Sequence, residues 1–242
     1  MFKRLAGPPD PPPAPPLPDI DVAAAHIIER VRPYTMTSAE RLFAVIEAAR
    51  YIAAARIPGD VVECGVWRGG SMMAAAAALL DANDGERHLH MFDTFEGMSE
   101  PGEEDVDLAG AAATEMLSAQ DRNDPASIWC YATMGEVQEA LATTSYESAR
   151  MHFVQGRVED TIPAQAPGSI ALLRLDTDWY ESTRHELEHL YPRLSVGGVL
   201  IVDDYGHWAG CRRAVNEYFA ARGTPVLLNR IDYTGRSLVK RA

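Results

Sequence analysis

The sequence lacks the features that mark exported and membrane-spanning proteins. Its three cysteines are an odd number without paired spacing, which argues against a disulfide framework and for a reducing cytoplasm. The longest strongly apolar run, Met72 to Leu80, is far shorter than the roughly 20 residues that span a bilayer. The N-terminus is basic but has no continuous apolar stretch before its prolines, so it does not read as a secretory signal. We therefore expect a soluble, cytoplasmic protein.

Positive charge is also scarce. The chain has 22 Lys and Arg against 35 Asp and Glu, which gives a formal net charge of −13 at pH 7. A chain this acidic is repelled by nucleic-acid phosphates and by anionic lipid headgroups, so neither is an expected partner. Because 47% of the 242 residues are apolar, the chain has enough material for a conventional buried core, and disorder throughout is excluded.

The order of the predicted elements indicates a single doubly wound α/β domain. Proline-rich residues 1–18 are predicted to form an extended arm, and helical patterns fill an N-terminal region over 19–57. Strand and helix patterns then alternate, which is typical of a mostly parallel sheet covered on both faces. We expect strands over 60–66, 88–94, 151–155, 170–176 and 198–203, helices from 69, over 179–191 and over 209–221, and a closing antiparallel hairpin of 225–231 and 236–240.

A long polar connection interrupts this alternation over residues 95–150. It exceeds the length of a simple crossover, and its first part, residues 99–107, is acidic and rich in turn residues. Two interpretations stay open: a mobile lid over a ligand site, or a solvated insertion with a helix of its own.

A glycine-rich turn follows the first strand, where residues 63–71 read ECGVWRGGS. Its glycines permit a tight turn and close backbone approach to a ligand, and the helix that it opens presents unpaired N–H groups. It is not the G-x-G-x-x-G dinucleotide motif. An acidic E-x-G-x-x-x-G turn is similar to that of class I methyltransferases, where backbone groups hold the methionine part of S-adenosylmethionine. A purely structural turn is the alternative.

Polar residues at the next strand ends are compatible with a nucleoside. Asp93 ends the second strand, where a carboxylate can accept hydrogen bonds from both ribose hydroxyls; helix N-capping is the alternative. Residues 158–161 (VEDT) follow the third strand, where class I methyltransferases place polar groups near adenine. An ordinary helix cap explains this segment nearly as well.

Four aspartates follow two strands that are predicted to be neighbours. Asp176 and Asp178 lie at the end of one strand, and Asp203 and Asp204 lie at the end of the next. Adjacent strands run about 4.8 Å apart, so these carboxylates converge. Like charges this close shift their pKa values strongly or need a cation, and oxygen ligands select a hard ion such as Mg²⁺. The sequence therefore predicts a metal site.

The segment HELEH over residues 185–189 formally matches the zinc-protease motif H-E-x-x-H. On a helix both histidines point roughly 160° away from the apolar Leu187, so we expect them to face solvent. No third ligand is evident, and we do not predict a zinc site. His207 and Trp208, just after the aspartate pair, are better placed to touch a substrate, with loop or core packing as the alternative.

Taken together, these segments resemble the macrocin O-methyltransferase family, the sugar-tailoring methylases of macrolide and aminocoumarin antibiotic pathways. The resemblance covers most of the chain from about residue 34 onward, in the family's order. The matching segments are TMTS (35–38), PGDVVECGVWRGGS (58–71), FDTFEGM (92–98), LLRLDTDWYEST (172–183) and VGGVLIVDDYGHWAGCRRAV (196–215).

The resemblance implies a class I methyltransferase domain over 58–242, S-adenosylmethionine as methyl donor, and Mg²⁺. The metal ligands would be Asp176, Asp203 and Asp204, and Asp176 would double as the base. The acceptor would be a small-molecule sugar hydroxyl, with Met36 and His207 near it. By motif, the cofactor-binding residues would be Thr37, Glu63, Gly65, Trp67, Gly69, Ser71, Asp93 and Asp160.

Other functions stay open on the sequence alone. A Mg²⁺-dependent catechol or phenolic methyltransferase is the nearest, although such enzymes usually show Asp-Asn where this chain has Asp203 and Asp204. A nicotinamide oxidoreductase and a catalytically silent adenosyl-binding scaffold are more distant. The N-terminal helical region is a candidate lid or dimer element, so we expect a homodimer or higher homo-oligomer.

Overall fold

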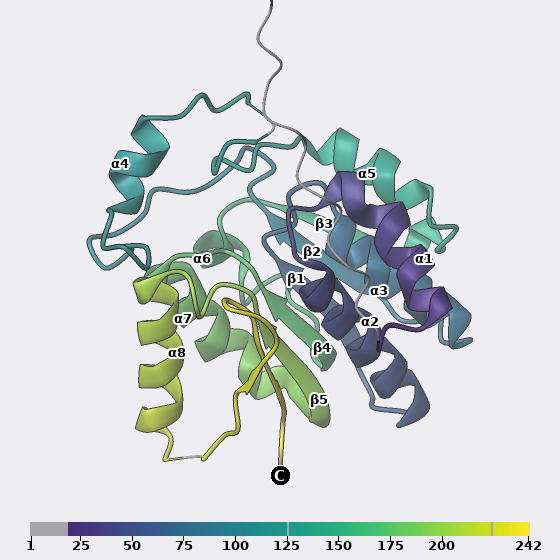
Figure 1. Cartoon of the computed structure of the whole chain (residues 1–242). Coiled ribbons are helices and arrows are strands. Elements are labelled where there is room, and N and C mark those ends of the chain that lie inside the picture. Colours follow the sequence, from purple (N-terminus) through teal and green to yellow (C-terminus); the bar gives the residue numbers. More distant parts are fainter. Residues whose placement is uncertain (1–18, 125, 224) are drawn as a thin grey trace, which may run out of the picture.

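The computed structural model describes residues 19–124, 126–223 and 225–242 (Figure 1). The predicted proline-rich arm over 1–18 therefore lies outside the described residues. Within the described ranges, no helix combines the length and the apolar character needed to cross a membrane.

Eight α-helices and seven strands make up the described part of the chain, with three short 3₁₀ helices between them. The strands are β1 (Asp60–Cys64), β2 (Leu89–Asp93), β3 (Met151–Gln155), β4 (Ile170–Leu175), β5 (Leu194–Val202), β6 (Asn229–Arg230) and β7 (Arg236–Val239). The helices are α1 (Val22–Val31), α2 (Ala39–Ala54), α3 (Gly70–Asp81), α4 (Ala113–Ser118), α5 (Met134–Ala142), α6 (Val158–Thr161), α7 (Tyr180–Leu190) and α8 (Ala209–Ala221).

The strands form one sheet in the order β3-β2-β1-β4-β5-β7-β6. Neighbouring strands from β3 to β5 pair in parallel, whereas β7 pairs antiparallel with both β5 and β6. The predicted α/β class and the antiparallel closing hairpin are therefore confirmed. The strand β5 begins earlier than predicted because Gly197 and Gly198 lie within it, at a register shift against β4, rather than ending a turn.

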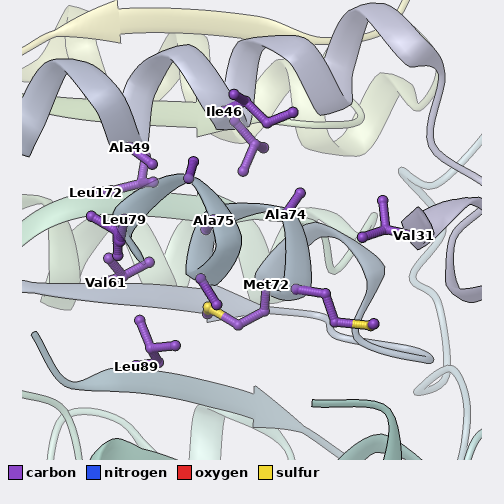
Figure 2. Packing of buried hydrophobic residues seen from close by; sticks show 14 of the residues in the cluster. Val31, Ile46, Ala49, Val61, Met72, Ala74, Ala75, Leu79, Leu89 and Leu172 are labelled. Atoms are coloured by element: carbon purple, nitrogen blue, oxygen red, sulfur yellow. The ribbon is translucent and has the colours of Figure 1, made fainter. Parts of the chain in front are cut away.

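One face of the sheet is covered by α1, α2 and α3 (Figure 1). The alanine-rich α3 packs against α2, which itself contacts β4 and β5, and Ala74 and Ala75 lie near Ile46 and Ala49 of α2 (Figure 2). Small side chains let two helices approach closely, since interaxial distance follows side-chain size. This packing fixes the start of α3, where the glycine-rich turn presents its backbone.

The other face is covered by α6, α7 and α8, with α4 beside them (Figure 1). On α7, Leu187 and Leu190 are buried, as the helical periodicity predicts. The rings of Trp179 and Trp208, which precede α7 and α8, pack edge to face with centroids 5.0 Å apart. The two helix starts that follow the carboxyl ends of β4 and β5 are thereby held together.

The predicted insertion contains α4 and α5, so it does have helices of its own. Its acidic stretch is not solvated throughout, because Asp105 is 1% exposed and accepts a 2.8 Å hydrogen bond from the backbone N–H of Tyr180 at the start of α7. The backbone N–H of Ala209 donates to the carbonyl of Val106 at 2.9 Å. A Cβ atom on Gly210 would lie 1.9 Å from the Asp105 carboxylate, so any larger residue would displace Asp105. The stretch is therefore anchored over the starts of α7 and α8.

Candidate active site

A cavity of about 320 Å³ opens at the carboxyl ends of β1, β2, β4 and β5. Ligands of open parallel sheets bind at this edge, because loops and helix N-termini converge there. The insertion forms one wall through residues such as Met98 and Ile128, and the β6–β7 turn forms another through Tyr233.

Most residues that the sequence singled out meet in this cavity. Its lining includes Met36, Thr37, Gly65, Trp67, Ser71, Asp93, Asp176, Asp203, Asp204 and His207. Glu63, Gly69 and Asp160 do not line it. Glu63 is buried behind the cavity in an ion pair, Gly69 is the left-handed N-cap of α3, and Glu159 lines the cavity where Asp160 does not.

The glycine-rich turn is held by Asp93. The Asp93 carboxylate accepts hydrogen bonds from the backbone N–H groups of Val66 at 2.6 Å, Trp67 at 3.1 Å and Phe95 at 2.6 Å. Trp67 itself has a left-handed φ of 47°, which costs energy for a non-glycine residue and needs such support. Asp93 therefore shapes the turn besides facing the cavity.

Gly65 brings this turn against the residues that follow β4. Its φ is 78°, and an added Cβ would lie 2.0 Å from the carbonyl oxygen of Asp176. The N–H of Asp176 in turn donates to the carbonyl of Cys64 at 2.8 Å. The two strand ends thus touch through backbone atoms, and only glycine allows the contact.

Three carboxylates converge beside this contact. Asp176, Asp178 and Asp204 each offer an oxygen, and these oxygens all lie within 4.8 Å of one another. One oxygen of Asp204, Oδ2, is buried without a hydrogen-bond partner among the described residues. Burial, reinforced by the neighbouring carboxylates, raises the pKa values of Asp176 and Asp204 well above their usual range and that of Asp178 to about 7.

This donor set suits a hard divalent cation. All of its donors are carboxylate oxygens, and one of them, Asp204 Oδ2, is buried without a hydrogen-bond partner among the described residues. A bound cation would relieve the repulsion between the three carboxylates. The resemblance implies Asp176, Asp203 and Asp204 as metal ligands, whereas the carboxylates that converge in the structure are those of Asp176, Asp178 and Asp204. We refer to Asp176, Asp178 and Asp204 as the carboxylate cluster.

Asp203 faces two arginines instead. Its Oδ1 accepts a 2.6 Å hydrogen bond from Arg174, and its Oδ2 is ion-paired with Arg41. Arg174, near the carboxyl end of β4, also pairs with Glu63 and with Asp176, each at 2.7 Å. Burial raises the pKa of Glu63 to about 7, although the adjacent Arg174 opposes the shift. Arg174 therefore connects the Asp176 side chain to a buried network of charged residues.

Arg41 connects the same network to the C-terminal hairpin. Its Nε donates to Asp232 at 3.0 Å, and the Ser38 hydroxyl donates to the same carboxylate at 2.8 Å. The Thr234 hydroxyl donates to the carbonyl of Asp203 at 2.7 Å. The start of α2 and the β6–β7 turn are therefore tied together beside the carboxylate cluster.

Arg41 and Arg174 were not singled out from the sequence. Arg174 does carry a signal, since a charge inside the apolar strand LLRLD must be paired when buried. Arg41 carries none, because an arginine in the first turns of an amphipathic helix looks like any solvated charge. Tyr233 was missed for a similar reason, as it falls in a turn.

Two exposed side chains in the cavity lining, Met36 and Tyr233, carry no charge. Met36 is 51% exposed and Tyr233 is 54% exposed. His207 also lines the cavity, and its ring centroid is 6.1 Å from that of Tyr233. Burial lowers the pKa of His207, so its imidazole is neutral at pH 7.

Comparison with known proteins gives a consistent result. The family model described as macrocin O-methyltransferase (TylF) matches residues 30–240. A Streptomyces olivaceus protein named 8-demethyl-8-(2,3-dimethoxy-alpha-L-rhamnosyl)-tetracenomycin-C 4'-O-methyltransferase is 35% identical over 202 residues, which are 84% of this chain and 74% of that protein. The demethyldecarbamoylnovobiocin O-methyltransferase of Streptomyces niveus is 33% identical over 77% of this chain and 68% of its own.

Solved structures agree on the fold. The O-methyltransferase NovP superposes with a TM-score of 0.74 at 32% identity, covering 86% of this chain and 83% of its own. CalS11, described as a TDP-rhamnose 3'-O-methyltransferase, superposes with a TM-score of 0.57 at 21% identity, covering 90% of this chain and 92% of its own. At that identity the likeness concerns the fold alone.

Proposed function

Because the chain belongs to the macrocin O-methyltransferase family, we propose that it transfers the methyl group of S-adenosylmethionine to a sugar hydroxyl of a glycosylated natural product, with Mg²⁺ in the carboxylate cluster. The observation that carries this proposal is the position of the cluster, which lies in one cavity with the glycine-rich turn of a class I methyltransferase fold.

The turn after β1 indicates which part of the cavity would bind the cofactor. We propose that the backbone around Gly65 holds the methionine part of S-adenosylmethionine and that Glu159 and Arg157 border its adenine. Asp93 supports this half by fixing the backbone of Val66 and Trp67. Its remaining hydrogen-bonding capacity faces the cavity, where a ribose would lie.

The chemical step needs a methyl donor and a more acidic acceptor hydroxyl. Bound S-adenosylmethionine supplies the electrophilic methyl, and a divalent cation lowers the pKa of a hydroxyl next to it. The carboxylate cluster orients the acceptor oxygen and takes its proton. The resemblance gives the proton-accepting role to Asp176, but Arg174 pairs with Asp176, and Asp178 has no arginine partner among the ion pairs of the described residues. We propose Asp178 as the proton acceptor and Asp176 as an orienting ligand.

The two ligand sets predict different effects of single substitutions. Asp178→Asn is expected to weaken Mg²⁺ binding at least tenfold, because a cluster carboxylate loses its charge. Asp203→Asn is expected to leave Mg²⁺ binding within threefold but to destabilise the fold by roughly 3 kcal/mol, because it deprives two arginines of a partner. Calorimetric Mg²⁺ titration and thermal unfolding measure both effects. Loss of Mg²⁺ binding in Asp203→Asn together with its retention in Asp178→Asn would contradict our assignment.

The charges in the cavity favour a neutral acceptor over a sugar nucleotide. Three arginines line the described cavity, and all are paired: Arg41 with Asp203 and Asp232, Arg157 with Glu159, and Arg174 with three carboxylates. A diphosphate would therefore enter without a free cationic partner, at a mouth lined by apolar Met36 and aromatic Tyr233. These side chains suit the apolar faces of a deoxysugar and its aglycone.

The experiment that tests the proposed function is an acceptor screen with labelled S-adenosylmethionine and Mg²⁺. We expect a neutral deoxyhexose glycoside to be methylated with a kcat/KM at least tenfold above that of the nucleoside-diphosphate form of the same sugar. Catechol serves as the control for a phenolic methyltransferase. Preferred methylation of the sugar nucleotide, or of catechol, would contradict the proposed acceptor class.

A further inference from the structure

The HELEH segment of α7 combines two half-buried histidines with a fully buried glutamate. His185 and His189 lie on the half-buried side with ring centroids 4.4 Å apart, and His185 hydrogen-bonds the carbonyl of Ile162 at 2.9 Å. Glu186 is 0% exposed, and its carboxyl contacts Thr177 rather than either histidine. The two histidines and the glutamate therefore do not converge on a metal, and the motif does not explain why a glutamate occupies this buried position.

The Glu186 carboxyl lies beneath the ends of two strands. Its Oε1 accepts a 2.9 Å hydrogen bond from the hydroxyl of Thr177, directly after β4. The thiol of Cys64, the last residue of β1, lies beside the same carboxyl and interacts with it. Its second oxygen, Oε2, is buried without a hydrogen-bond partner among the described residues.

Thr177 connects this carboxyl to the reactive side of the cavity. It lines the cavity and stands between Asp176 and Asp178, two members of the carboxylate cluster. The single proton of the Ser182 hydroxyl is shared between the carbonyls of Thr177 at 3.3 Å and Trp179 at 3.2 Å, so α7 contacts Thr177 through both its side chain and its backbone. The conformation is unusual as well, because Asp178 has a left-handed φ of 69°.

Burial of a carboxyl group at this position costs free energy of folding. Burial raises the pKa of Glu186 well above its usual range, and no arginine or lysine forms an ion pair with it in the described part of the chain. An apolar side chain of similar volume would avoid the desolvation of a polar group. Departures of this kind from the rules of core packing are expected where a residue serves a site.

We propose that Glu186 is a positioning residue of the methyl-transfer site. Through the Thr177 hydroxyl it fixes the turn that carries Asp176 and Asp178, and the backbone N–H of Asp176 bonds the carbonyl of Cys64, next to the glycine-rich turn that follows β1. The distance between the methyl donor and the carboxylate cluster is set by this contact. The inference rests on the proposed function, since it assigns a role within the same site.

The steady-state kinetics of Glu186 and Thr177 variants, including the conservative Glu186→Gln, test this positioning role. Glu186→Leu and Thr177→Val are each expected to lower kcat at least tenfold with KM changing less than threefold, because small displacements of reacting groups cost up to about 10²-fold. The double variant is expected to be no worse than the poorer single variant, since both changes break one connection. Glu186→Gln retains a neutral acceptor of the same shape and is expected to keep at least half of the wild-type kcat. Glu188→Gln, on the exposed side of α7, is the matched control.

A second readout does not depend on turnover. The N–H of Asp176 is bonded to the carbonyl of Cys64, so its hydrogen exchange reports how firmly the two strand ends are held. Exchange in peptides covering 173–179 is expected to rise at least tenfold in Glu186→Leu and to stay unchanged in Glu186→Gln and Glu188→Gln, at similar melting temperatures. Unchanged exchange in folded Glu186→Leu would overturn the inference, whatever the enzyme methylates. A wild-type protein that methylates no acceptor would instead count against the proposed function alone.

Discussion

Asp176→Asn is expected to reduce methyl transfer by roughly 10³-fold while cofactor affinity stays within threefold of wild type. The substitution preserves the size of the side chain but removes its negative charge. Both candidate sets of metal ligands include this carboxylate, which also forms a 2.7 Å ion pair with Arg174. The fold should persist, because Arg174 keeps its ion pairs with Glu63 and Asp203. Turnover measured at saturating S-adenosylmethionine and Mg²⁺, beside a cofactor titration, separates the loss of chemistry from the loss of binding.

Asp81→Asn is the matched control for this prediction, since Asp81 is an exposed aspartate at the end of α3, outside the cavity. It should leave both turnover and cofactor affinity unchanged. A variant Asp176→Asn with turnover close to wild type would show that the carboxylate cluster is not the reactive part of the cavity, and the proposed mechanism would then be wrong.

Gly65→Ala is expected to abolish measurable cofactor binding and to destabilise the fold by about 2–5 kcal/mol. The new methyl would lie 2.0 Å from the carbonyl oxygen and 2.6 Å from the carbonyl carbon of Asp176, and the backbone φ of 78° disfavours any side chain. Because the opposing atoms are backbone, relief requires the two strand ends to move apart. That movement displaces the glycine-rich turn and the carboxylate cluster together.

Gly135→Ala tests whether this effect is specific to the contact. A Cβ at Gly135 would meet nothing within 4 Å, and the residue lies in the first turn of α5 with an ordinary φ. Alanine there should raise the melting temperature slightly, since it favours the helix by up to about 1 kcal/mol. Cofactor titration and thermal unfolding of both variants give the comparison. Wild-type affinity in folded Gly65→Ala would show that the turn does not contact the cofactor.

The sequence predicts the fold well because local patterns and the final structure agree. The switch between apolar runs and helical periodicity locates β1 to β4, and α8 is predicted with its observed bounds, Ala209–Ala221. The strand β5 is predicted too short, because two glycines in a row resemble a turn when they in fact accompany a register shift. The two-residue β6 is too short to leave a pattern of its own.

The candidate site is predicted in outline but not in its partnerships. Four aspartates at two strand ends indicate a cation site, yet alternation alone does not say which of Asp203 and Asp204 joins the carboxylate cluster and which pairs with Arg41. Tertiary partners from distant segments decide that. The burial of Glu186 has the same origin, since HELEH reads as a surface pattern until the ends of β1 and β4 are placed beneath α7.

The most direct test of the account is a calorimetric titration of S-adenosylmethionine and Mg²⁺ into the wild-type protein and into a variant carrying both Asp176→Asn and Asp204→Asn. The account predicts that the wild type binds both and that EDTA removes the metal response. It also predicts that the double variant keeps the cofactor but loses Mg²⁺. A wild-type protein that binds no S-adenosylmethionine, or a double variant that binds Mg²⁺ as the wild type does, would contradict the methyl-transfer site described above.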